Sequence, residues 1–339
     1  MKIPSWLTIV GITVSTLAVD IPASSASVNA ASIEAAKEST YYAYGLPSEL
    51  VDRLKQHEQN TSCQASRKNS TTHYQTWINR AIALQQQQRH RESLECLNRA
   101  LALQPQEKQA WYRRGIASSH LQQHSQAAFA YQQSLKLDSQ QPTAWYNLGN
   151  AYKHLGQAQK AIAAYEAAIA LKADFHTAYY QLGRVFGKIG QYDRAIAAYA
   201  TVIDLNPEDL RASYSLGSLY YRLKRYDKAI SVYLQALKTQ PKQHRAWYNL
   251  GNIYLKQKNY IEAIAAYEAA IELKPDYDLA WNNHGAALEA LQQNKRALDS
   301  YSQALQVNPN YEKASNNHRR LLMLLDEGDR ILSNSDNVQ

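Results

Sequence analysis

The chain repeats itself every 34 residues, and this repetition limits the folds open to it more than any other feature. The stretch AWYNLGNAYKHLGQAQKAIAAYEAAIALK, which begins at Ala144, returns 102 residues later as AWYNLGNIYLKQKNYIEAIAAYEAAIELK, beginning at Ala246. Because 102 is three times 34, the sequence between them can be aligned in the same steps. Seven units follow one another without an insertion over residues 74–311: 74–107, 108–141, 142–175, 176–209, 210–243, 244–277 and 278–311.

The apolar side chains of a unit predict two helices joined by a turn. Trp145 and Tyr152 fall on one face of a first helix, and Ala161 and Tyr165 fall on one face of a second. The residue four places after the tryptophan position is small in every unit, which lets the two helices approach closely. These small residues are Ala81, Gly115, Gly149, Gly183, Gly217, Gly251 and Gly285.

Glycine and proline mark where the predicted helices end. Gly156 interrupts the pattern between the two helices of its unit, as a helix C-terminus does. Proline ends the second helix because it cannot continue the hydrogen-bond ladder. Five units close in this way, at Pro105, Pro207, Pro241, Pro275 and Pro309. One hairpin cannot bury its apolar face alone, so we expect the hairpins to stack on a continuous core.

The pattern W-x2-L-G-x2-Y, then A-x3-Y, then P resembles the tetratricopeptide repeat, which has the same period. The fullest match is made by Trp247, Leu250, Gly251, Tyr254, Ala263, Tyr267 and Pro275. The resemblance implies an all-α fold, a right-handed α-solenoid (superhelix) of antiparallel helix pairs. The end units depart from the pattern, as solenoid caps do. The departures are Arg80, Leu84, Arg114, Ser118, His284 and Leu288.

Residues 1–30 predict a signal peptide. Lys2 precedes an apolar run that ends at Val19, and small residues follow, with cleavage expected after Ala26 or Ala30. The protein is therefore expected to be exported, to a periplasm, a lumen or the extracellular space. A membrane anchor over residues 3–19 is the alternative, because about 17 residues are just enough to span a bilayer. An apolar start of a cytoplasmic protein is a third interpretation.

The segments that flank the repeats have different compositions. Residues 31–73 predict a lead-in with one short helix after Pro47. Residues 312–332 continue the register as a capping helix, and residues 333–339 are expected to be a disordered tail. Leu321, Leu322 and Leu325 are expected to pack on the last repeat. The neighbouring Met323 and Leu324 are then left on other faces, either as isolated apolar residues of a cap or as a docking patch.

The two cysteines, Cys63 and Cys96, predict a disulfide if the protein is exported, because cysteines often pair in an oxidising compartment. The bridge would attach the lead-in to the second helix of the first repeat. Two free or buried thiols are the alternative if the protein stays in a reducing compartment.

Motifs for catalysis are absent from the sequence. It has no G-x-S-x-G, no P-loop and no H-E-x-x-H, and its cysteines lack the spacing of a zinc site. We therefore predict no catalytic residue, no metal, no cofactor and no small-molecule substrate. The net charge of +8 belongs to the repeats and favours acidic partners. A nucleic-acid-binding solenoid is less favoured, because the basic residues form no dense stripe.

In solenoids of the family that this chain resembles, the first helices line a concave groove. Tyrosine recurs there directly after the tryptophan position, asparagine recurs next, and basic residues follow. Asparagine offers a donor and an acceptor to a peptide backbone, and tyrosine offers rigid contact area. The predicted peptide-binding groove comprises Asn79, Tyr112, Tyr146, Asn147, Asn150, Lys153, Tyr180, Arg184, Arg211, Tyr214, Arg222, Arg245, Tyr248, Asn249, Asn252, Lys256 and Asn283. In these columns only Glu289 is expected to oppose the positive charge.

Two known groove chemistries bear on these residues. The asparagine column resembles the ladder that holds substrate backbones in the repeat domain of the peptide O-linked N-acetylglucosamine transferase. The carboxylate clamp of chaperone-binding repeats fits less well. Asn150 and Asn252 match one clamp position and Arg211 and Arg245 could serve another, but tyrosine stands where the clamp has lysine. The tyrosines could instead pack between neighbouring first helices.

The sequence thus predicts a non-catalytic protein–protein interaction scaffold that binds an extended, acidic peptide segment in a basic groove lined by tyrosine and asparagine. An assembly factor or a non-catalytic subunit of a membrane or envelope complex is the alternative. Contact with a membrane is expected only through the N-terminal segment, if it is not cleaved.

Overall fold

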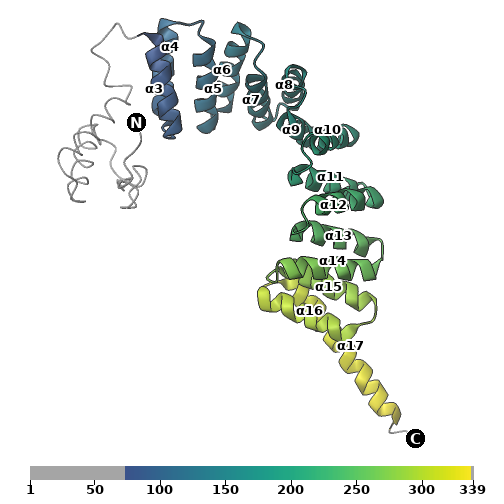
Figure 1. Cartoon of the computed structure of the whole chain (residues 1–339). Helices are drawn as coiled ribbons and strands as arrows, with labels where there is room; N and C mark the ends of the chain where they lie inside the picture. Colours follow the sequence, from purple (N-terminus) through teal and green to yellow (C-terminus); the bar gives the residue numbers. More distant parts are fainter. Residues whose placement is uncertain (1–72, 337–339) are drawn as a thin grey trace, which may run out of the picture. The chain divides into compact units, whose positions relative to one another are not determined.

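The computed structural model describes residues 73–336, with side chains up to Asp326. Within these residues the chain forms fifteen α-helices and no strand (Figure 1). The predicted signal peptide and the predicted helix after Pro47 lie outside the described residues. The helices are α3 (Tyr74–Gln86), α4 (His90–Leu103), α5 (Lys108–His120), α6 (His124–Leu137), α7 (Pro142–His154), α8 (Ala158–Leu171), α9 (His176–Lys188), α10 (Tyr192–Leu205), α11 (Leu210–Arg222), α12 (Tyr226–Thr239), α13 (His244–Lys256), α14 (Tyr260–Leu273), α15 (Asp278–Ala290), α16 (Asn294–Val307) and α17 (Glu312–Asp336).

The helices follow the 34-residue register of the sequence. From α3 to α16, a helix of 13 residues alternates with a helix of 14 residues, and each predicted unit holds one of each. Figure 1 shows them as successive helical hairpins. This arrangement confirms the predicted all-α fold built from antiparallel helix pairs.

The chain divides into two compact units, Met1–Ala164 and Tyr165–Gln339, with the boundary inside α8. We call them the N-terminal unit and the C-terminal unit and describe each by itself. The described part of the N-terminal unit holds α3 to α7 and the start of α8. The C-terminal unit holds the end of α8 and the helices α9 to α17.

The small-residue column is explained by the tyrosine that packs on it from the second helix of the same repeat. A β-carbon built on any of five glycines of this column would lie only 2.4–2.8 Å from the tyrosine ring, so a larger residue does not fit. The tyrosines are almost completely buried. The pairs are Gly115 with Tyr131, Gly183 with Tyr199, Gly217 with Tyr233, Gly251 with Tyr267 and Gly285 with Tyr301.

The turn inside each hairpin contains one residue in the left-handed backbone conformation. Gly156, which the sequence marks as a helix end, has a φ of 72°, and Gly190 has a φ of 81°. Both lack the β-carbon that makes this conformation costly. The other hairpins place glutamine or lysine at the same position, with φ between 57° and 62°: Gln88, Gln122, Lys224, Lys258 and Gln292.

The tryptophan column ties four of the first helices to the end of the preceding repeat. The indole N–H of Trp111 donates to the carbonyl of Pro105 at 2.8 Å. The same bond joins Trp281 to Pro275 at 2.9 Å. A half-buried tryptophan thus satisfies its one polar atom while its ring packs on the core. The bond fixes the geometry of the connection between repeats.

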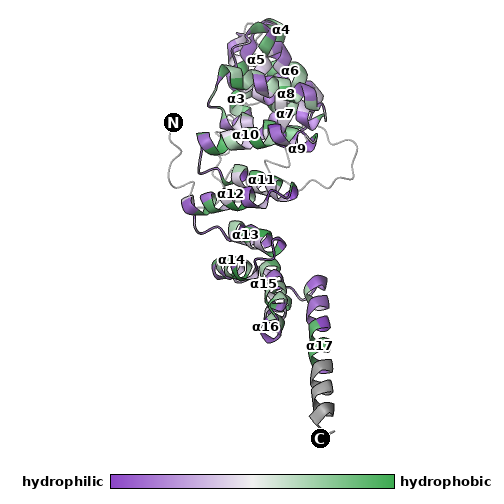
Figure 2. Cartoon of the chain, turned by 90° about the vertical axis from the view of Figure 1, so that its right-hand side faces the viewer, coloured by the Kyte–Doolittle hydropathy of each residue, from purple (hydrophilic) through white to green (hydrophobic). Residues whose placement is uncertain are grey.

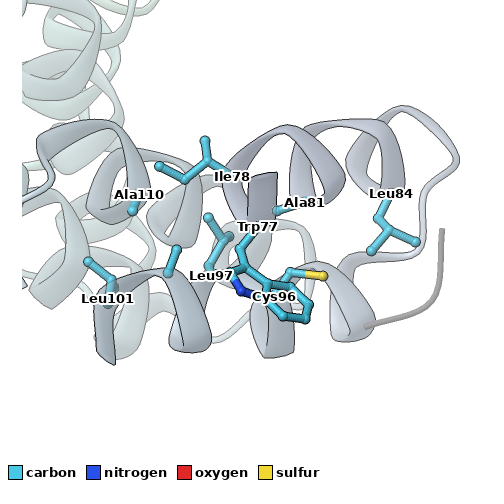
Figure 3. Close-up of a cluster of buried hydrophobic side chains, with 9 residues drawn as sticks. Trp77, Ile78, Ala81, Leu84, Cys96, Leu97, Leu101 and Ala110 are labelled. Atoms are coloured by element: carbon cyan, nitrogen blue, oxygen red, sulfur yellow. The ribbon is translucent and has the colours of Figure 1, made fainter. Parts of the chain in front are cut away.

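The first repeat is closed by a core of its own, formed by α3, α4 and the start of α5 (Figure 3). Trp77 and Leu97 are buried there, and Figure 3 shows Cys96 beside the Trp77 ring. Cys96 is fully buried and takes part in a disulfide. Its predicted partner, Cys63, lies outside the described residues, so the Cys63–Cys96 pairing stays a prediction.

The last helix differs from the prediction in its length and its packing. α17 extends to Asp336, four residues beyond the predicted end at 332, because no glycine or proline in the intervening sequence stops it. Leu321 is buried as predicted, but Leu322 is 44% exposed and the prediction that it packs on the last repeat is wrong. The neighbouring Met323 and Leu324 are also exposed, at 57% and 53%. Figure 2 shows the hydrophilic start of α17, which precedes this hydrophobic stretch. Leu322 stays exposed because α17 is the last described helix, so no second helix covers it.

Candidate peptide-binding face

The predicted groove residues all lie on first helices, but they belong to two units. The N-terminal set contains one exposed residue, Asn79, and five half-buried ones: Tyr112, Tyr146, Asn147, Asn150 and Lys153. In the C-terminal set the basic residues are exposed: Arg184, Arg211, Arg222, Arg245 and Lys256. Its other members are half-buried: Tyr180, Tyr214, Tyr248, Asn249, Asn252 and Asn283. We call the C-terminal set the tyrosine–arginine face.

Four of the five tyrosines in the two sets pack on the buried tyrosine of their own repeat. The ring centroids are 5.8–6.1 Å apart and the rings are tilted by 50–53°. This geometry supports the interpretation that the tyrosines are packing residues. They remain half-buried, however, so each keeps part of its surface available to a partner. The pairs are Tyr112 with Tyr131, Tyr180 with Tyr199, Tyr214 with Tyr233 and Tyr248 with Tyr267.

The tyrosine hydroxyls connect successive first helices. The Asn147 side-chain amide donates to the Tyr112 hydroxyl at 3.3 Å. The amide of Asn283 donates in the same way to Tyr248, also at 3.3 Å. Each bond joins residues 35 positions apart, from one repeat to the next. The asparagine column therefore has a structural task, which the sequence did not reveal.

The asparagines differ in how many donors and acceptors remain for a partner once their hydrogen bonds within the protein are made. Both N–H donors of Asn283 are used, since its amide also donates to Asn252 at 2.8 Å, and its oxygen accepts from Asn282 at 2.9 Å. Asn249 donates to the Tyr233 hydroxyl at 3.2 Å, and no described residue donates to its oxygen. Asn252 accepts two hydrogen bonds through its oxygen, while its amide nitrogen has no acceptor among the described residues.

At the C-terminal end, buried asparagine replaces the tyrosine column. Asn282 occupies the tyrosine position of the last repeat and is fully buried. Its side-chain oxygen accepts from Asn317 of α17 at 3.0 Å, and its amide donates to Asn283. A buried amide must be paired in this way to avoid a desolvation penalty. This chain of amides attaches α17 to the last repeat, so Asn282 and Asn317 are structural.

Two carboxylates pair differently from what the sequence predicts for the face. Asp209, whose side chain is only 4% exposed, pairs with Arg211 through two contacts at 3.0 and 2.7 Å. The bonds that Arg211 donates hold the pKa of Asp209 below its usual value. Glu289, expected to oppose the groove cations, instead pairs with Arg320 at 2.6 Å. The sequence missed the first pair because Asp209 precedes the helix and lies outside the columns that were compared.

The other basic residues of the face have no carboxylate partner in the described part of the chain. Arg222 lies over the ring of Tyr192, 4.7 Å from its centroid. Arg184 donates to the Gln181 amide oxygen at 3.4 Å. Arg245 and Lys256 form no ion pair with any described residue. The face therefore combines partly exposed tyrosine rings with uncompensated positive charge.

The geometry of the described residues does not indicate catalysis or metal binding. No group of three or more His, Cys, Asp or Glu side chains among them could hold a metal ion. His284 is buried, which lowers its pKa, and it contacts Ser300 at 3.0 Å and Glu268 at 3.5 Å. These contacts explain how a histidine is accommodated at the leucine position of the last repeat. No described helix has the length and apolar character that crossing a bilayer requires.

Family models described as tetratricopeptide repeat, or TPR repeat, match more than half of the chain. The matched residues are 74–107, 120–156, 149–190, 180–243, 244–277 and 279–311. The chain belongs to the tetratricopeptide repeat family. Repeats of this family generally mediate protein–protein binding, and its members are typically non-catalytic. This TPR protein is accordingly a protein-interaction scaffold.

Solved TPR structures share the fold. The C-terminal part of a TPR repeat-containing protein from Cytophaga hutchinsonii matches with a TM-score of 0.64 and 20% identity, covering 70% of this chain and 98% of that one. A TPR protein from Parabacteroides merdae matches with a TM-score of 0.50 and 16% identity, covering 74% of this chain and 98% of that one. YrrB, described as a TPR protein with an unusual peptide-binding site, matches with a TM-score of 0.49 and 21% identity over 57% of this chain and 100% of its own. No curated protein matches.

Proposed function

We propose that this TPR protein binds an extended, acidic segment of a partner protein on its tyrosine–arginine face and does so without catalysis. The observation that carries the proposal is the pairing of partly exposed tyrosines with basic residues that no described carboxylate neutralises. Rigid aromatic surface gives binding energy at a low entropy cost. Uncompensated positive charge favours acidic segments and speeds their association.

The side chains of α13 support a contact with the backbone of the segment. Asn249 and Asn252 are three residues apart, so they lie on the same side of the helix. The oxygen of Asn249 can accept a backbone N–H, and the nitrogen of Asn252 can donate to a backbone carbonyl. Such a pair recognises an extended chain whatever its side chains are. Asn283 has no part in this proposal, since both of its N–H donors are used within the protein and its oxygen already accepts from Asn282.

A peptide screen on the full chain tests the proposal. Peptides selected from a random displayed library should be rich in acidic residues, and one synthetic hit then serves as the probe for fluorescence anisotropy. Replacing Tyr248 by alanine should weaken binding by about 2 kcal/mol if it is a hot spot. Tyr260→Ala is the matched control, because Tyr260 is also half-buried but lies at the start of the second helix α14.

The same probe measures the electrostatic part. Affinity should fall as the salt concentration rises, because exposed charges act through screened, long-range attraction. Circular dichroism must show that Tyr248→Ala keeps its helicity, since the ring also packs on Tyr267. A folded Tyr248→Ala variant that binds the probe as tightly as the unmodified chain would show that this face is not the site.

We also propose that the protein acts after export, on the basis of the residue pattern of the segment 1–30. Cell fractionation followed by N-terminal sequencing should find the mature chain outside the cytoplasm, beginning at Ser27 or Ala31. A cytoplasmic protein that retains Met1 would contradict this proposal.

A further inference from the structure

Two arginines occupy the same position of consecutive repeats but have different neighbours. Arg211 is the second residue of α11, and Arg245 is the second residue of α13. Asp209 precedes α11, accepts from the backbone N–H of Arg211 at 3.0 Å and pairs with its guanidinium. The charge of Arg211 is therefore balanced by a nearly buried carboxylate, which no ligand displaces without leaving that carboxylate unpaired.

Arg245 lacks such a partner because Gln243 stands where the previous repeat has Asp209. The Gln243 side chain is neutral, does not cap α13, and donates to the Gln240 amide oxygen at 3.1 Å. No described carboxylate lies within ion-pair distance of Arg245. An exposed guanidinium in this position keeps its donors for an incoming acceptor.

The surroundings of Arg245 are aromatic and positively charged. Tyr214 and Tyr277 lie close enough to feel the charge of Arg245. Burial raises the pKa of both hydroxyls, and the positive charge of Arg245 acts against this rise. Tyr277 packs on Tyr248 with ring centroids 5.0 Å apart, so these rings continue the tyrosine–arginine face. Burial and the nearby charges of Lys274 and Arg245 lower the pKa of His244, against a smaller opposing effect of Asp276.

We infer that Arg245, and not Arg211, is the subsite that receives the side-chain carboxylate of an aspartate or glutamate in the bound segment. This inference rests on the proposed function, and it assigns the preference of the tyrosine–arginine face for acidic segments to one residue. An arginine binds a carboxylate through two parallel hydrogen bonds, and the flanking rings reduce the water that competes for them. Arg211 has already formed this arrangement with Asp209.

Two defined peptides test the inference on the full chain. The probe is octaglutamate with an amidated C-terminus, which is acidic only through its side chains, and the reference is octaglutamine amide. Octaglutamate should bind more tightly, and Arg245→Gln should weaken its binding about ten-fold, the loss expected for one charge-assisted contact. Arg211→Gln should change it less than about two-fold. Octaglutamine with a free C-terminus tests whether the site binds a terminal carboxylate and not a side-chain carboxylate. If this peptide binds more tightly than octaglutamine amide, the side-chain assignment is wrong.

Exchanging the neighbours of the two arginines gives the sharpest test, because both arginines stay in place. Gln243→Asp supplies Arg245 with the partner that Arg211 has, and should weaken octaglutamate binding about as much as Arg245→Gln does. Folding is not at risk, since aspartate is a favoured N-cap residue. Asp209→Gln should strengthen binding, because it removes the carboxylate that balances the charge of Arg211. Unchanged affinity in Gln243→Asp, or an equal loss in Arg211→Gln and Arg245→Gln, would overturn the inference.

A titration of His244 locates the contact independently of affinity. A carboxylate bound at Arg245 offsets the positive charges beside His244, so the pKa of His244 followed by NMR should rise on saturation with octaglutamate. A pKa that does not move would place the carboxylate elsewhere.

Tyr248→Ala separates this inference from the proposed function. If Tyr248→Ala weakens octaglutamate binding while Gln243→Asp does not, the face binds the segment and the subsite is wrong. If the arginine variants act and Tyr248→Ala does not, the carboxylate site stands and the extended groove fails. If octaglutamate does not bind, both fail.

Discussion

In the N-terminal unit, consecutive repeats meet through pairs of stacked histidines. His90 of α4 lies on His120 of α5 with ring centroids 4.2 Å apart and rings almost parallel, at 3°. One repeat later, His124 of α6 lies on His154 of α7 at 4.5 Å and 10°. In the C-terminal unit, the residues 102 positions after His90 and His120 are Tyr192 and Arg222. There the guanidinium lies over the tyrosine ring.

The comparison shows one contact position between repeats filled by two chemistries that respond differently to pH. Two neutral imidazoles stack without repulsion, but histidine is the side chain that gains a positive charge in mildly acidic solution. Arginine keeps its charge at every pH of interest, and a tyrosine ring attracts that charge. The His90–His120 junction should therefore weaken in acid, whereas the Tyr192–Arg222 junction should not.

A second difference lies inside the repeats. In the C-terminal unit, glycine on the first helix meets tyrosine on the second, as Gly251 meets Tyr267. In the first repeat of the N-terminal unit, alanine and leucine take these places, as Ala81 and Leu97, and both are fully buried. The two positions change together, since the bulk removed from one helix makes room for the β-carbon of the other.

The largest expected effect comes from placing a methyl group at this contact. Gly251→Ala puts a β-carbon about where the Tyr267 ring lies, 2.6 Å from its Cε1 atom. Overpacking of this kind costs about 2–3 kcal/mol, which exceeds the gain in helix propensity from glycine to alanine of about 1 kcal/mol. The net loss should appear in urea unfolding of the full chain.

The matched control copies the first repeat. In Gly251→Ala/Tyr267→Leu, the alanine has the small partner that Ala81 has, so the double variant should lose less stability than the two single losses added together. Some cost remains, because Tyr267 donates to Asn252 at 2.8 Å and leucine cannot. If the two losses simply add, the glycine and the tyrosine are not coupled in the way described.

The sequence predicts the helices well because the repeat averages out local ambiguity. A glycine such as Gly251 or a turn residue such as Gly156 is ambiguous alone, but its position in the register identifies its task. The polar contacts of the candidate face are different. The pairing of Asp209 with Arg211 and the bond between Asn147 and Tyr112 depend on side-chain geometry between residues that no column of the alignment relates.

The stack of His90 on His120 predicts a loss of stability of the N-terminal unit in acid. Burial and the charge of His120 lower the pKa of His90 in the folded protein. Arg89 and Glu92, which lie close to His90 in the sequence, pair with each other at 2.6 Å. Because the folded pKa lies below the unfolded one, the contribution to stability is complete above about pH 6.5 and is lost as the pH falls below that value. Two imidazolium rings about 4 Å apart repel by roughly 1 kcal/mol even in water.

A double variant tests this acid sensitivity by placing the residues of the C-terminal junction at the N-terminal one. His90→Tyr/His120→Arg reproduces the pair Tyr192–Arg222 in the N-terminal unit. The difference in unfolding free energy between pH 7.5 and pH 5 should become smaller in the variant than in the unmodified chain. An unchanged difference would mean that groups other than this stack cause the acid sensitivity.

The Tyr192–Arg222 contact itself should contribute less. Arg222 is exposed, and an exposed cation over an aromatic ring is worth about 0.5–1 kcal/mol. Arg222→Gln should therefore lower the unfolding free energy by about 0.5 kcal/mol, equally at pH 5 and pH 7.5. A loss that grows in acid would show that the two junctions do not differ as described, and Lys224→Gln provides a nearby control for removal of one positive charge.

The smallest expected effect concerns the hairpin turns. Gln122 has a φ of 58° and its side chain is exposed, whereas Gly156 fills the same position one repeat later with a φ of 72°. A residue with a β-carbon pays about 1–2 kcal/mol for the left-handed conformation, and glycine pays about 0.5–1 kcal/mol in backbone entropy. Gln122→Gly should thus stabilise the N-terminal unit by about 0.5 kcal/mol, and Lys258→Gly should do the same for the C-terminal unit.

Both gains are measured by urea unfolding. Gln123→Gly, one residue further along, is the control and should be destabilising, because the φ of −82° at Gln123 gives glycine no advantage. A loss of stability in Gln122→Gly would mean that the glutamine side chain makes a contact worth more than the strain it accepts.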